Sequence, residues 1–190
     1  MRNVIQWLAL ILMSVGCLGA GPLTGANDAP IYHSSQPGSP WWTINDTVMG
    51  GRSQSTWLQP VGKPAVFEGL LSLENNGGFT SVRSGPIPAT NGQFSSFQVT
   101  VRGDGRTYQF IARSRRLRQG INYQAGFATQ ANTLTTVKLP LSAFQARWRG
   151  RDIDDAPPLS FDDLHSVGFL LADKRPGPFR LEVHEVRAIP

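Results

Sequence analysis

Apolar residues alternate with polar ones through much of this chain, with the period of two that β-strands require. Residues 97–101 and 108–112 each place an apolar side chain at every second position, and an Asp104-Gly105 turn signal lies between them. As a two-residue type I′ turn, Asp104-Gly105 would bring apolar residues opposite one another, so we predict a hairpin. A continuous apolar run at 166–173 is typical of a central strand buried on both faces. With 20 glycines and 14 prolines to supply turns, the sequence predicts an all-β jelly-roll sandwich of about eight strands.

Two polar turn segments interrupt this strand pattern. Residues 41–53 join adjacent tryptophans to Asn45-Asp46 and then to a pair of glycines. Asn and Asp side chains bend the backbone through local hydrogen bonds, and glycine permits positive φ. Residues 74–83 carry a second turn with paired asparagines and glycines, which we predict to connect strands 65–73 and 79–83 as a hairpin. Arg83 would then project near a strand end.

Together these two segments resemble the signature of the complex I intermediate-associated protein 30 family. Further segments resembling that family follow in its order at 102–108, 123–127, 139–144, 149–151 and 173–179. The resemblance covers roughly residues 41–190. It implies a galactose-binding-like jelly roll and the role of an assembly factor, or chaperone, for NADH:ubiquinone oxidoreductase. It also implies protein partners, among them subunits of respiratory complex I.

The first 20 residues have the pattern of an export signal. A single Arg precedes an apolar run at 4–13 and then small residues, as in a signal peptide or lipoprotein leader. Cys17, the one cysteine, ends a motif similar to a bacterial lipobox, so two outcomes are open: acylation of Cys17 with membrane attachment, or cleavage after Ala20 or Ala26. Residues 21–40 read as a flexible tether and 41–190 as the jelly-roll domain. We therefore expect a periplasmic protein or a membrane-anchored lipoprotein of a bacterial envelope.

The chain lacks the sequence signatures of common catalytic and cofactor sites. Its three histidines are not at metal-ligand spacing, and there is no nucleophile elbow, phosphate loop or dinucleotide fingerprint. The sequence predicts a protein that is not an enzyme and holds no cofactor. It contains no metal-binding motif, and a structural calcium held through backbone carbonyls stays open, because no motif would reveal it. The basic side chains are fifteen Arg against three Lys, and because Arg suits bidentate contacts with carboxylates and phosphates, acidic partners are left open. Four of these Arg, at 113–118, suit either a solvated loop or contact with lipid phosphates or an acidic partner; nucleic acid is disfavoured by the leader.

Most polar residues of the family-like segments lie at or beside turns. We predict that they gather into one polar binding surface at the loop end of the jelly roll. Its members would be Asn45, Asp46, Arg83, Asp104, Arg106, Tyr123, Arg151, Asp173 and Lys174. The arginines would clamp a carboxylate or sugar hydroxyls, and Tyr123 or Trp148 would add a flat platform. The alternative is a set of independent turns, each with its own hydrogen bond.

Three functions remain open at this stage. The first is an exported, non-catalytic binding protein related to the assembly factor, with a protein or carbohydrate partner. The second is a carbohydrate-binding module of the cell envelope unrelated to complex I. A distant third is an enzyme of unknown type.

Overall fold

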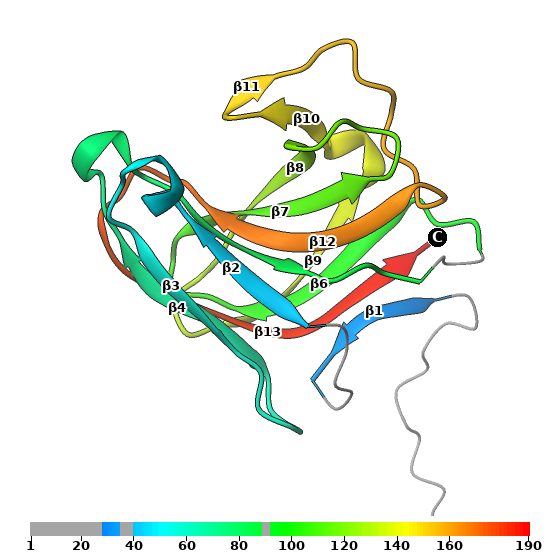
Figure 1. Ribbon diagram of the computed structural model, residues 1–190. Coiled ribbons are helices and arrows are strands. Elements are labelled where there is room, and N and C mark those ends of the chain that lie inside the picture. The colour runs from blue at the N-terminus through cyan, green and yellow to red at the C-terminus, as the bar shows by residue number, and fades with distance from the viewer. Residues whose placement is uncertain (1–27, 35–39, 89–91) are drawn as a thin grey trace, which may run out of the picture.

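The chain forms two antiparallel β-sheets that pack face to face (Figure 1). The computed structural model describes residues 28–34, 40–88 and 92–190. The six-stranded sheet has the order β3-β4-β13-β6-β9, and β1 pairs with β13 beyond the end of β4. Its strands are β1 (Ala29–His33), β3 (Gln54–Leu58), β4 (Ala65–Leu71), β6 (Ser96–Arg102), β9 (Leu134–Pro140) and β13 (Gly177–Ile189).

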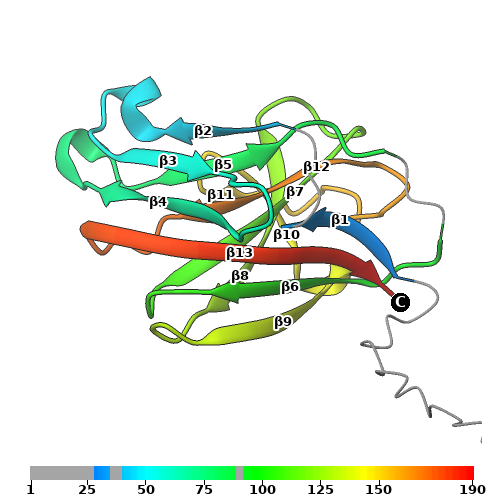
Figure 2. The same cartoon turned by 90° about the horizontal axis from the view of Figure 1, so that it is seen from below.

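The second sheet has seven strands in the order β11-β10-β8-β7-β12-β5-β2. Its strands are β2 (Trp41–Asn45), β5 (Thr80–Ser84), β7 (Thr107–Ser114), β8 (Ile121–Ala128), β10 (Gln145–Trp148), β11 (Arg151–Asp152) and β12 (Leu164–Leu171). Three short 3₁₀ turns connect strands: η1 (Asp46–Met49), η2 (Glu74–Asn76) and η3 (Leu141–Ala143). Figure 2 shows the two layers from a second direction. The predicted all-β jelly-roll sandwich is confirmed, with thirteen strands in the described residues instead of about eight.

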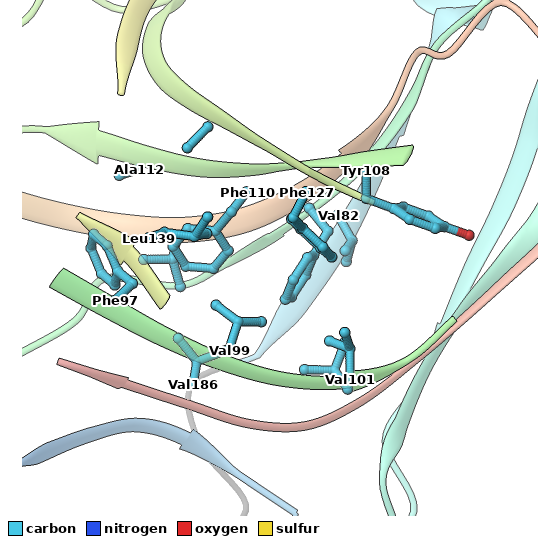
Figure 3. Close-up of a cluster of buried hydrophobic side chains, with 14 of the residues drawn as sticks. Val82, Phe97, Val99, Val101, Tyr108, Phe110, Ala112, Phe127, Leu139 and Val186 are labelled. Carbon is cyan, nitrogen blue, oxygen red and sulfur yellow. The ribbon is translucent and has the colours of Figure 1, made fainter. Parts of the chain in front are cut away.

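The core lies between the sheets and is built from the inward-facing residues of both. Phe97 of β6 meets Phe110 of β7 with ring centroids 5.0 Å apart (Figure 3). Where β2 and β3 meet, Trp41 stacks on Trp57 at 4.5 Å and closes one side of the sandwich. Because side chains alternate across a strand, Trp42 points to the opposite face of β2. The central position of β12, between β7 and β5, confirms the strand predicted from its apolar run.

Both predicted hairpins are wrong, because each pair of strands lies in two different sheets. β6 pairs with β13 and β9, whereas β7 pairs with β8 and β12. Strands that face each other across a sandwich need the same inward alternation as strands that pair, so the pattern alone did not distinguish the two. Where the chain passes from β6 in one sheet to β7 in the other, the Asp104 carboxylate accepts a hydrogen bond from the Arg106 N–H at 3.1 Å. This bond forms an Asx turn instead of the predicted type I′ turn.

The second mispredicted hairpin joined β4 and β5. β4 pairs with β3 and β13, and β5 pairs with β2 and β12. Between them, Asn75 and Asn76 adopt left-handed conformations at φ 56° and 58°, a longer excursion than a hairpin turn. The segment carries the chain from one sheet to the other.

The predicted tether differs from the structure at β1, since residues 29–33 pair with β13 instead of remaining free. The leader at 1–20, Cys17 and much of the rest of the tether lie outside the described residues. Within the described part of the chain, no helix is long and apolar enough to cross a membrane.

Candidate binding surface

Asp46 is a buried carboxylate at the start of η1, with 0% of its surface exposed. The Ser53 hydroxyl and N–H donate to it at 2.6 and 2.8 Å, and the N–H groups of Gly78 and Phe79 donate at 2.7 and 3.2 Å. Burial alone would raise the pKa of Asp46, but these hydrogen bonds outweigh it and hold the pKa below its ordinary value. Asp46 therefore ties the loop after β2 to the loop before β5. We call this group the Asp46 cluster.

Two glycines make room for this carboxylate. A Cβ on Gly51 would lie 2.4 Å from the Asp46 side chain, and one on Gly77 would lie 2.6 Å from it. Beside it, Asn45 accepts hydrogen bonds at 2.6 Å from hydroxyls on β3 and β5. Each glycine pair in the family-like segments thus contains a residue that leaves space for one buried acid.

Arg106 and Asp173 form a second buried cluster. The guanidinium donates to both carboxylate oxygens, at 2.9 and 2.6 Å, and the two side chains are only 6% and 9% exposed. The carbonyl oxygen of Pro178 accepts a further bond at 3.1 Å. The hydrogen bond to Asp173 raises the pKa of Arg106; burial would raise the pKa of Asp173, but Arg106 outweighs it and lowers that pKa.

Asp104 extends this Arg106 cluster. Its carboxylate accepts hydrogen bonds from the Tyr108 hydroxyl at 3.0 Å and the Arg180 N–H at 2.8 Å. Burial, then the charge of Asp104, raises the pKa of Tyr108. Lys174 is exposed in the adjoining turn. The cluster thus fastens the entry to β7 onto the turn between β12 and β13.

The other predicted site residues lie in separate places. Tyr123 faces the core and its hydroxyl donates to the Pro157 carbonyl at 2.5 Å, so it offers no exposed platform. Arg151 is exposed on the short edge strand β11, and Trp148 shares the side of β10 that Ala146 turns to the core. Arg83 lies on β5 with its side chain on the outer face of the seven-stranded sheet, since its neighbours turn inward.

The prediction of one exposed polar surface therefore does not match the structure. The two clusters do lie at the same end of the sandwich, because Leu171 of β12 pairs with Thr80 and Leu71 of β4 pairs with Gly177. Their charged groups, however, are bonded to one another instead of facing a partner. This geometry fits the alternative reading, in which each of these residues stabilises a turn through its own hydrogen bonds. A role of these residues in binding stays a prediction.

A different polar surface emerges from the register of the seven-stranded sheet. Residues that alternate with the core residues of β2, β5, β12, β7, β8 and β10 all point to the face away from the six-stranded sheet. We call this surface the outer face. Its central members are Trp42, Arg83, Gln109, Ile111, Arg113, Asn122, Gln124, Gln145, Arg147, Ser166, Gly168 and Leu170.

Long side chains with amides dominate the part of this face formed by β7, β8 and β10. Gln124 donates to Asn122 at 2.8 Å, and Gln124 is flanked in register by Ile111 and Gln145. Gln109 extends over Gly126, whose missing side chain leaves it room. Ile111 points outward but is only 1% exposed, so its longer neighbours close over it. The result is a row of hydrogen-bonding groups above a small apolar floor.

Trp42 and two arginines occupy the other part of the face. Trp42 is 47% exposed and lies in register beside Arg83, which faces Gly168 on its other side. Burial and the nearby charge of Arg113 lower the pKa of Arg83. An aromatic ring, cations and amides thus share one surface.

Sequence reasoning named Arg83 but missed the rest of this surface. Arg113 entered only as part of a basic run, and Gln109, Gln124 and Gln145 were not among the predicted site residues. The signal was present as polar residues between core residues in 107–114, 121–128 and 145–148. It became a surface only once the strand order was known.

Two other features bear on the choice of site. A shallow hollow of about 500 Å³ is lined by residues 70–74, Pro176 and Gly177 at the end of β4, and its lining is mainly apolar. It carries none of the amides or unpaired cations of the outer face. Among the described residues, no group of three or more His, Cys, Asp or Glu is arranged to hold a metal ion.

The fold resembles the β-sandwich of solved carbohydrate-binding modules. A family 11 carbohydrate-binding module of a cellulosomal cellulase of Clostridium thermocellum superposes with a TM-score of 0.64 at 13% identity, covering 87% of this chain and 96% of the module. A family 11 module from that organism in complex with a β-1,3-1,4-mixed-linked tetrasaccharide gives 0.61 at 12% identity, over 87% and 97%. At these identities the likeness establishes the fold alone.

Sequence comparison identifies the family. The family sequence model described as Complex I intermediate-associated protein 30 matches residues 32–183. The chain therefore belongs to that family, as the two turn segments predicted. The mitochondrial Complex I intermediate-associated protein 30 of Mus musculus is 29% identical over 167 aligned positions. That match covers 75% of this chain and 50% of the mouse protein, so the chain spans about half the length of this relative.

Proposed function

We propose that this protein is a non-catalytic binding protein of the complex I intermediate-associated protein 30 family whose outer face recognises a carbohydrate. The observation that carries the proposal is the composition of that face, where amides, arginines and an exposed tryptophan share one surface. Sugar hydroxyls both donate and accept hydrogen bonds, as do amides, and an aromatic ring packs on the apolar side of a sugar ring. The carbohydrate-binding modules with this fold support the proposal at the level of architecture.

A second candidate is an assembly factor that holds a protein partner, including subunits of respiratory complex I. Family membership favours it. The predicted leader opposes it, since an exported chain would be separated from an assembly site on the cytoplasmic or matrix side. We therefore propose export to a bacterial envelope, with Cys17 as the site of lipid attachment if the leader is cleaved there. Cell fractionation discriminates the two: a cytoplasmic protein would favour the assembly role.

The direct test is binding of the purified chain to a panel of polysaccharides in affinity gels. Trp42→Ala and Gln124→Ala remove groups of the outer face without touching the core, and each should abolish or strongly reduce retardation. Gln98→Ala is a matched control, because Gln98 lies on the opposite, outward side of β6 in the six-stranded sheet. The proposal would be contradicted if both outer-face variants still bound every polysaccharide that the native protein binds, or if Gln98→Ala lost binding to the same extent.

A further inference from the structure

Arg83 and Arg113 lie on either side of β12 on the outer face. Arg83 of β5 pairs in register with Gly168, and Arg113 of β7 pairs with Ser166, two residues along the same strand and on the same face. Their Cα atoms are thus separated by two strand spacings, about 10 Å across the sheet, and by two residues, about 7 Å along the strands. The residues between them are small, so the two guanidinium groups flank a low strip of surface.

These two arginines differ from every other partly buried or buried arginine that the structure describes. Arg106, Arg147 and Arg187 each form an ion pair with a carboxylate. Neither the Arg83 nor the Arg113 side chain has a hydrogen-bond or ion-pair partner among the described residues, and Nε of Arg83 is buried without one. The other arginines of the described chain that lack such a partner are exposed to water.

Holding two such cations near each other has an energetic cost in the free protein. Burial lowers the pKa of Arg83, and the positive charge of Arg113 lowers it further. The described strands that form the outer face contain no Asp or Glu, and Asp152 on the adjoining edge strand β11 is already paired with Arg147 at 2.7 Å. The missing anion must therefore come from outside the chain if the cost is to be offset.

We infer that the outer face binds an acidic polysaccharide, with a sugar carboxylate held between Arg83 and Arg113. This inference rests on the proposed function and specifies its ligand. A planar guanidinium matches a carboxylate in two parallel hydrogen bonds, and two of them can grip one carboxylate or two successive ones along a chain. The neighbouring amides and Trp42 suit the hydroxyls and ring faces of a sugar better than an acidic peptide.

The experiment measures binding of the full chain to polygalacturonate by isothermal titration calorimetry, beside neutral mixed-linkage β-glucan, dextran sulfate and poly-glutamate. We expect polygalacturonate to bind most tightly of the four, and we expect its binding to weaken when salt is added. Arg83→Gln and Arg113→Gln should each raise its Kd by about tenfold or more, which is the effect of losing a charged contact of about 1.4 kcal/mol. Arg102→Gln is the matched control, since Arg102 lies exposed on β6 in the other sheet and pairs with Glu182.

Thermal unfolding of the same variants separates binding from folding. Both outer-face substitutions should leave Tm unchanged or raise it, because each removes an unpaired cation. Unchanged affinity of both variants would overturn the inference, as would dextran sulfate or poly-glutamate binding as tightly as polygalacturonate. Binding of neutral glucan without polygalacturonate would refute the acidic ligand but leave the carbohydrate proposal standing. Failure of every polysaccharide to bind would refute both.

Discussion

Replacing Asp46 by Asn tests whether the Asp46 cluster holds the sandwich together. Asn keeps the size of the side chain and one acceptor oxygen, and with this oxygen in the place of Oδ2 the N–H groups of Gly78 and Phe79 stay paired. The new NH₂ group then faces the Ser53 N–H, which in the native protein donates to Oδ1 at 2.8 Å. That N–H loses its acceptor, at a cost of about 1–3 kcal/mol for a donor left without a partner.

This loss predicts a destabilisation of about 1–3 kcal/mol, a sizeable share of the roughly 5–15 kcal/mol by which domains are stable. Equilibrium unfolding in urea, followed by tryptophan fluorescence, measures this change at pH 7. Asp154→Asn is the control, because Asp154 is exposed in a loop and has no hydrogen bond in the described structure. A change below about 0.5 kcal/mol in Asp46→Asn, as expected of a surface substitution, would refute the reasoning.

Three further predictions follow from the same geometry. Hydrogen bonds hold the pKa of Asp46 and of Asp173 below the ordinary 3.8. The ionised carboxylates therefore stabilise the folded protein above pH 3.8, and this stabilisation is lost as the pH falls through their pKa values in the folded state. Acid unfolding curves should show this loss, and Asp46→Asn should reduce it. Arg106→Met should cost about 3–5 kcal/mol in urea unfolding, because it leaves Asp173 buried and unpaired; a cost under 1 kcal/mol would contradict the buried pair. Trp41→Ala should lower stability by about 3–5 kcal/mol through loss of the stack on Trp57, whereas Trp42→Ala should change it by less than about 1 kcal/mol; equal costs would show that the two rings are not on opposite faces.

The sequence predicted the strands better than their partners. The alternation at 97–101 and 108–112 marks which side chains enter the core, and the structure confirms it. Whether two such strands pair or face each other depends on contacts distant in sequence, and the Asp-Gly signal between them favoured the wrong choice. The structure explains this error, because Asp104 forms an Asx turn in a segment that connects the two sheets, so Asp-Gly does not mark a hairpin here.

Site prediction was limited for a related reason. Polar residues at turns, such as Asp46 and Arg106, looked available for binding because a sequence shows no burial. Their internal partners lie 7 to 72 positions away along the chain, beyond the reach of a local pattern. Arg83 and Arg113 are 30 positions apart and share a surface only because β12 inserts between their strands.

Mapping a bound oligosaccharide onto the backbone tests most directly the claim that the outer face is the binding surface. In ¹⁵N-labelled protein titrated with oligogalacturonate, the account predicts that the largest NMR shift changes fall on β5, β7, β8 and β12, with the side-chain signals of Trp42 and Gln124 among them. The six-stranded sheet, including β4 and β9, should change little. Shifts concentrated on that sheet, or at the hollow beside Leu73, would contradict the account.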